Sequence, residues 1–91
     1  MVENMSGMNV DEVRRLALAL STRAADVRKM VATMTSSLEG AEWRGADRER
    51  FMKEWRNVHA AALLKMATAL EQAARDATTN ANAQDRVSSS W

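Results

Sequence analysis

Apolar residues recur along the first half of the chain at alternating intervals of three and four positions. They fall at Val10, Val13, Ala17, Leu20, Ala24, Val27, Val31, Met34 and Leu38, and Leu16 and Met30 widen the apolar face. This seven-residue repeat is typical of a helix that packs along a neighbouring helix at a small crossing angle. Asn9 is a suitable N-cap with Glu12 three residues later, and Gly40 is a suitable terminator. The pattern predicts a helix over about residues 10–39.

A second helical pattern begins after Gly45. One apolar row consists of Phe51, Trp55, Val58, Ala62, Met66, Ala69 and Ala73, and a second row consists of Leu63, Leu70, Ala74 and Ala77. Beyond these rows the chain is rich in threonine, asparagine and serine, which compete with helical hydrogen bonds. We therefore predict a helix over about residues 46–81, a flexible lead over 1–8 and a flexible tail over 82–91.

The segment 40–45 separates the two helical patterns and predicts a reversal of the chain. There is no proline, and the chain has only three glycines, two of which bracket this segment. Helices joined by so short a connection form an antiparallel hairpin. We expect one all-α domain, a helix-turn-helix hairpin over residues 9–81. Its predicted core consists of Val13, Leu20, Val27, Met34, Leu38, Phe51 and Trp55.

A single hairpin leaves apolar surface uncovered, because each helix buries one apolar row against its neighbour and the second row stays exposed to solvent. The chain has 91 residues, so its core is small, and it has no cysteine from which to form a disulfide. Pairing of two hairpins into a four-helix bundle is the common remedy. We therefore expect a dimer whose interface contains Leu63, Met66, Leu70 and Ala74.

Charge and hydropathy narrow the classes of partner. The 13 lysines and arginines nearly balance the 12 aspartates and glutamates, and the two signs alternate along the chain. A nucleic-acid-binding protein usually carries a basic stripe, so we expect no nucleic-acid partner. The first residues lack the basic and apolar regions of a signal peptide, and no apolar run approaches the ~20 residues of a membrane span. We therefore expect neither a cleaved signal nor stable membrane insertion.

Residues suited to catalysis are missing from the sequence. There is no cysteine nucleophile and no glycine-rich phosphate loop, and His59 is the single histidine. Metal sites and acid–base catalysis need several suitable groups together, and a general acid or base also needs a cleft that tunes its pKa. We expect no catalytic residue, no metal, no cofactor and no enzymatic activity. Methionines at apolar positions, such as Met30, Met34 and Met66, are more often adaptable core residues than functional ones.

Three of the four aromatic residues lie close together, around the predicted turn. The turn reads Trp43-Arg44-Gly45, and Phe51 and Trp55 follow on one face of the second helix. We expect Trp43 to pack over the tip and Gly45 to let the backbone reverse. This arrangement resembles the Trp-x-Gly family of small type VII secretion proteins, the early secretory antigenic target type. The resemblance spans about residues 9–81.

The resemblance implies a bacterial, effector-associated protein that is assembled in the cytoplasm. Family members pair head-to-tail, with themselves or with a paralogue, and are exported folded by a membrane machine that includes a secretion ATPase. Many carry a Tyr-x-x-x-Asp/Glu export motif just after the second helix, near residues 77–81 here, but this chain contains no tyrosine. Trp91 is then a candidate contact for export or for a partner, or a chance terminal residue.

The leading hypothesis is therefore a secreted type VII substrate or secretion partner that acts as a homodimer or heterodimer. The alternative is an intracellular helical adaptor or chaperone subunit that uses the same hairpin without export. A nucleic-acid-associated bundle is a third class, which the balanced charge disfavours.

Overall fold

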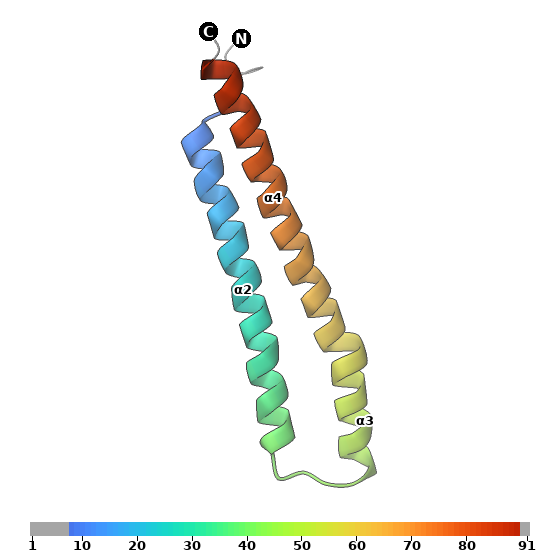
Figure 1. Cartoon of the computed structure of the whole chain (residues 1–91). Coiled ribbons are helices and arrows are strands. Elements are labelled where there is room, and N and C mark those ends of the chain that lie inside the picture. The colour runs from blue at the N-terminus through green and yellow to red at the C-terminus, as the bar shows by residue number, and fades with distance from the viewer. Residues whose placement is uncertain (1–7, 90–91) are drawn as a thin grey trace.

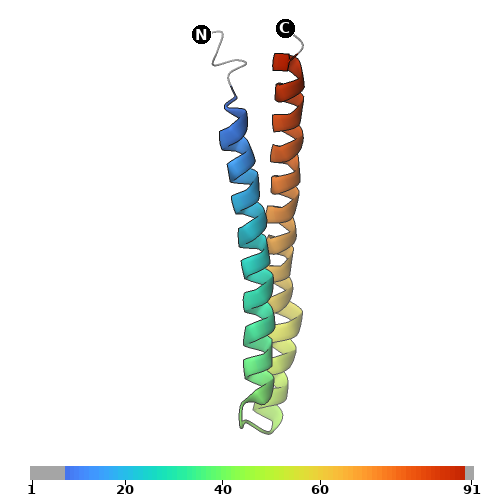
Figure 2. The same cartoon turned by 60° about the vertical axis from the view of Figure 1, so that its left-hand side comes forward.

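The chain folds into two antiparallel helical arms. The computed structural model describes residues 8–89, and every regular element within them is a helix. The first arm is α2 (Val10–Gly40), and the second consists of α3 (Ala46–Glu54), the π-helical segment η1 (Trp55–Ala60) and α4 (Ala61–Ser89). The molecule measures 68 × 19 × 17 Å, and the two arms run side by side for most of this length (Figures 1 and 2). The predicted all-α class is confirmed, and the arms form a hairpin.

The helix ends follow from local chemistry. The Asn9 side-chain oxygen accepts a hydrogen bond from the Glu12 amide at 3.0 Å, which confirms the predicted cap. Gly45 precedes α3 with a φ of 105°, a conformation that side chains with a Cβ rarely adopt. Gly40 is the last residue of α2, and Ala41 follows it in an extended conformation.

The second arm is longer than the sequence pattern predicts. The helix continues to Ser89, eight residues past the expected end at Ala81, so the structure replaces the expected tail with helix over 82–89. Contacts with α2 explain the difference, because Ala81 is fully buried and Arg14 donates a hydrogen bond to the Asn82 side chain at 2.9 Å. These contacts offset the low helix propensity of the polar residues. Residues 1–7, in the predicted lead, and residues 90–91, including Trp91, lie outside the described residues.

The row of η1 and α4 that packs against α2 differs from the one that the sequence pattern favours. Four alanines seven residues apart are buried, with three half-buried residues beside them: Ala60, Ala67, Ala74 and Ala81, then Leu63, Leu70 and Ala77. The predicted contact row is largely exposed, with 54% of Val58 and 52% of Met66 accessible to solvent. The second predicted row therefore exchanges places with the first at the contact with α2.

The π-helical segment η1 causes this exchange. Buried Met52 is followed by buried Ala60 after eight residues, and Trp55 is likewise followed by Leu63 after eight, where a regular repeat would need seven. A π-helical turn accommodates one extra residue. One residue corresponds to about 100° of rotation in an α-helix. The row of α4 that faces α2 is therefore not the row that an uninterrupted seven-residue repeat would continue from α3 and Trp55.

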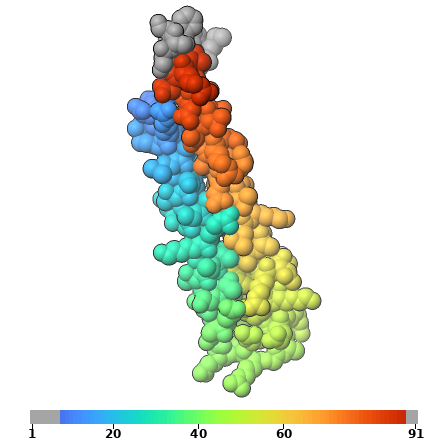
Figure 3. Space-filling view, in the orientation of Figure 1, coloured from blue at the N-terminus to red at the C-terminus, as the bar shows by residue number. Residues whose placement is uncertain are grey.

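Side-chain size sets how closely the arms approach each other. Near the chain ends the contact is made by small residues, such as Ala17 and Ala24 on α2 and Ala74 on α4. Near the turn, Met52 and Trp55 fill the space, and interaxial distance grows with the side chains at the contact. The arms accordingly separate toward the turn in Figure 1, while the space-filling view shows side chains filling the space between them (Figure 3).

Candidate functional site

The turn carries an aromatic pair on its surface. The rings of Trp43 and Phe51 lie 5.2 Å apart between centroids with an interplanar angle of 53°. Trp43 is 36% exposed and Phe51 is 42% exposed, so the pair closes the tip as a surface contact and Phe51 is not a core residue. An aromatic pair of this geometry contributes about 0.5–1.5 kcal/mol beyond its buried area.

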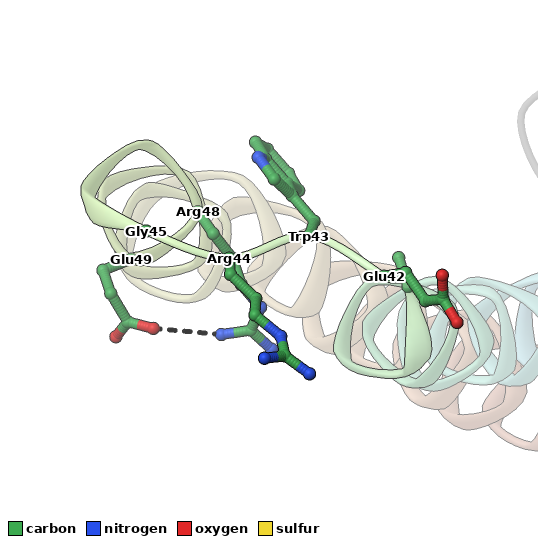
Figure 4. Close-up of a pocket in the computed structure, with 7 residues that line it drawn as sticks. Glu42, Trp43, Arg44, Gly45, Arg48 and Glu49 are labelled. Carbon is green, nitrogen blue, oxygen red and sulfur yellow. Dashed lines mark hydrogen bonds and ion pairs between the residues drawn. The ribbon is translucent and has the colours of Figure 1, made fainter.

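The other side of the turn is charged, with arginine and glutamate side chains together. Figure 4 shows the Trp43 ring pointing away from the side on which the guanidinium groups of Arg44 and Arg48 gather. Arg48 pairs with the Glu49 carboxylate at 3.1 Å. These charged side chains, with Trp43 and Gly45, line a shallow depression. The Trp43-Arg44-Gly45 motif therefore presents one aromatic side and one charged side.

Trp55 connects η1 to α2 through a hydrogen-bond relay. Its indole N–H donates to the Thr35 hydroxyl oxygen at 2.8 Å, and that hydroxyl donates to the Val31 carbonyl at 2.8 Å. Trp55 is half-buried, which agrees with its predicted position facing α2. The sequence pattern did not identify Thr35 as its partner, because the repeat marks only apolar positions.

One flank of the hairpin is closed by ion pairs between the arms. The Arg28 guanidinium donates to both oxygens of the Glu71 carboxylate, at 2.8 and 3.0 Å, and also to the Thr68 hydroxyl. Arg14 pairs with Asp85 at 3.3 Å on the same flank. The hydrogen bonds from Arg28 hold the pKa of Glu71 below its usual range. Bidentate geometry makes the Arg28–Glu71 pair the most specific of these contacts.

The Arg28–Glu71 pair predicts a defined pH dependence. Because the folded pKa of Glu71 is lowered, its contribution to stability is present above the ordinary glutamate pKa of about 4.3 and is lost as pH falls through the lowered value. The stability difference between wild type and Glu71→Gln, measured by urea unfolding, should shrink as the pH falls from neutral through that window. Arg28→Met should raise the Glu71 pKa measured by carboxyl NMR. A stability difference that grows toward low pH would contradict this assignment.

The opposite flank is apolar and is called the open face below. Each helix of the hairpin has residues on either side of its buried row. In an antiparallel pair, the residues that follow the buried row around the helix lie on the same flank in α2 and in α4, and the residues that precede it lie on the other flank. The arginine contacts occupy one side, so the remaining apolar positions share the other. The open face consists of Val13, Leu16, Leu20, Val27, Met30 and Met34 on α2, and Leu63, Met66, Leu70, Ala73 and Ala77 on α4.

The open face contains much of the solvent-accessible apolar surface of the hairpin. Leu16 is 57% exposed, Met66 52%, Met30 47% and Met34 45%, and the other members are half-buried apart from exposed Ala73. Between Leu16 and Ser37, Arg23 is the one charged residue at the positions of α2 that lie on this flank. An apolar surface that runs along two helices is typical of a protein–protein interface.

The residues predicted for the core and for the interface are redistributed. Val13, Leu20, Val27 and Leu38 are half-buried, but Met34 is too exposed to be a core residue and lies on the open face. Among the predicted interface residues, Leu63, Met66 and Leu70 lie on the open face. Ala74 is instead buried between the arms, because η1 turns its row toward α2.

Two kinds of site are missing from the described part of the chain. Among residues 8–89, no three His, Asp or Glu side chains are grouped so that they could hold a metal ion. No helix in the same range is long and apolar enough to cross a membrane.

The fold defines a helical-hairpin protein with an aromatic turn and one apolar flank. No protein-family model, no curated protein and no solved structure matches this chain. The resemblance to the Trp-x-Gly proteins therefore stays a prediction.

Proposed function

We propose that this protein acts by pairing with a second helical hairpin through the open face. The single observation that carries the proposal is the apolar flank along both arms, which lies opposite the flank closed by Arg14 and Arg28. A second copy of the chain supplies a matching apolar flank, so two hairpins form a four-helix bundle. Stable interfaces of this kind bury on the order of 2,000 Å² or more.

The cellular role that fits this pairing is that of a small type VII secretion substrate or secretion partner. Support comes from the Trp43-Arg44-Gly45 motif, which lies in the turn between two long arms, with the Phe51 ring tilted against the tryptophan ring. In this proposal the paired hairpins are assembled in the cytoplasm and exported folded, after recognition by the secretion ATPase. A paralogous hairpin is the alternative partner. An adaptor or chaperone subunit that stays inside the cell is the alternative role.

A charge placed on the open face should abolish pairing without unfolding the hairpin. Met66 is 52% exposed, so Met66→Glu leaves the contact between the arms intact but places a carboxylate in the proposed interface. An unpaired buried charge costs several kcal/mol, so we expect the dissociation constant to rise at least about 100-fold. Analytical ultracentrifugation measures this change, and circular dichroism reports retained helix.

A matched control is available on α2. Leu18 is 69% exposed and lies outside the open face, so Leu18→Glu should pair as wild type does. Equal losses of pairing in both variants would contradict the assignment of the interface. A wild-type chain that stays monomeric at micromolar concentrations would exclude self-pairing and leave a paralogue as the partner.

An export experiment distinguishes the role in type VII secretion from the role of an intracellular adaptor or chaperone subunit. The wild-type protein should appear in the medium of a host with a type VII system and should remain inside when the secretion ATPase is deleted. Met66→Glu, which is folded but unpaired, should remain inside in both strains, whereas Leu18→Glu should be exported. Retention of the wild-type protein in both strains would favour the adaptor role.

A further inference from the structure

Methionines are concentrated on the open face. The structure describes five methionine side chains, and three of them, Met30, Met34 and Met66, belong to that face. Each of the three is close to half exposed, whereas Met52 is only 2% exposed and belongs to the core. The open face therefore presents methionine side chains to solvent, whereas the methionine of the core is covered.

The three methionines lie within about one helical turn of one another along the hairpin. Arg28 on α2 contacts Thr68 and Glu71 on α4, which fixes the register of the arms. Two residues closer to the turn, Met30 is therefore level with residues 66–69, the stretch that begins with Met66. Met34 lies one helical turn further along α2, on the same flank. The three side chains form one patch, called the methionine patch below.

We propose that the methionine patch is an oxidation site that switches the open face from an apolar to a polar surface. The inference rests on the proposed function, because the consequence of oxidation is the loss of pairing between hairpins. Methionine sulfoxide is polar, and its formation disrupts methionine-rich interfaces. Three sulfoxides within about one helical turn place three polar groups without hydrogen-bond partners in the middle of the interface.

Peroxide is the oxidant class that fits this chemistry. A sulfur lone pair of the thioether attacks one peroxide oxygen, so that an S–O bond forms and the O–O bond breaks. The sulfur is oxidised to a sulfoxide, and the other peroxide oxygen leaves as hydroxide, takes up a proton and is reduced to water. Each methionine consumes one hydrogen peroxide, and methionine sulfoxide reductases reverse the change.

The site is tested by the order in which the methionines react. Dilute wild-type protein is treated with hydrogen peroxide, and each methionine is followed by peptide mass spectrometry. Met30, Met34 and Met66 should be oxidised at least about tenfold faster than buried Met52, because susceptibility follows exposure. Oxidation of Met52 at the same rate as the patch in this dilute, unpaired protein would overturn the site.

The switch is tested by the association of the oxidised protein. Oxidation of the methionine patch should raise the dissociation constant at least about 100-fold while the helical signal is retained. The two classes of methionine sulfoxide reductase should restore pairing. The triple variant Met30→Leu, Met34→Leu and Met66→Leu keeps the apolar surface without sulfur, so it should pair before and after the same peroxide dose.

The outcomes distinguish the switch from the function on which it rests. Loss of pairing in the oxidised triple variant, or a wild-type dimer that survives oxidation of all three methionines, overturns the switch alone. An unoxidised wild-type protein that is already monomeric overturns self-pairing, and the switch falls with it, while the reaction order still decides the site.

Discussion

Replacing Trp55 with alanine is expected to lower the free energy of unfolding by about 3 kcal/mol, the largest loss for any single truncation in this hairpin. The indole fills the space between η1 and α2, and its N–H donates to the Thr35 hydroxyl at 2.8 Å. Truncation leaves a cavity and removes the link between the arms beside the turn. Urea unfolding at one fixed protein concentration measures the loss, since pairing changes apparent stability.

Two further variants separate the ring of Trp55 from its hydrogen bond. Trp55→Phe keeps most of the apolar volume and removes the donor, so it should cost about 1 kcal/mol. Trp43→Ala is the matched control in the turn. Trp43 is 36% exposed, so its loss should also cost about 1 kcal/mol. A larger loss for Trp43→Ala than for Trp55→Ala would mean that the tip aromatics, and not the relay, hold the arms together.

Replacing Ala67 with leucine should destabilise the hairpin by about 2 kcal/mol, because an overfilled contact forces the arms apart. Ala67 is fully buried at the centre of the alanine row. Ala69, two residues later, is exposed, so Ala69→Leu should change stability by less than about 0.5 kcal/mol. Thermal and urea unfolding measure both changes.

The two alanine variants also decide which row of α4 faces α2. A regular continuation from Trp55 by sevens reaches Ala62 and then Ala69, whereas the structure places Leu63 and Leu70 toward α2. A large loss for Ala69→Leu with little effect of Ala67→Leu would contradict the π-helical insertion. The pair thus tests a feature of the fold that the sequence repeat did not predict.

The sequence repeat correctly predicted the buried positions of α2, because no insertion interrupts it. From Val10 to Leu38 the apolar residues keep their seven-residue spacing, and the buried residues Ala17, Ala24 and Val31 lie on it. The Asn9 cap and the positive φ of Gly45 follow from local hydrogen bonding and from the missing Cβ. All of these features depend on residues near one another in sequence.

The buried row of the second arm was harder to predict from the sequence, because that arm carries two apolar rows. Each row satisfies a helical repeat, so periodicity alone does not identify the one that α2 covers. The sequence also did not predict helix beyond Ala81, since the residues there have low helix propensity and their contacts come from Arg14, on the other arm. Exposure of Met34 and burial of Ala74 follow from the same long-range contacts.

The local sequence was enough to predict an all-helical hairpin with an aromatic turn between residues 40 and 46, because helix periodicity, capping and glycine conformation are local properties. Contacts between the arms set the rotation of α4, the length of the second arm, the pairing of Arg28 with Glu71 and the location of the open face. These features depend on how two arms distant in sequence fit together. Close packing of small alanines against α2 favours one rotation over another, and only the folded pair of arms contains that contact.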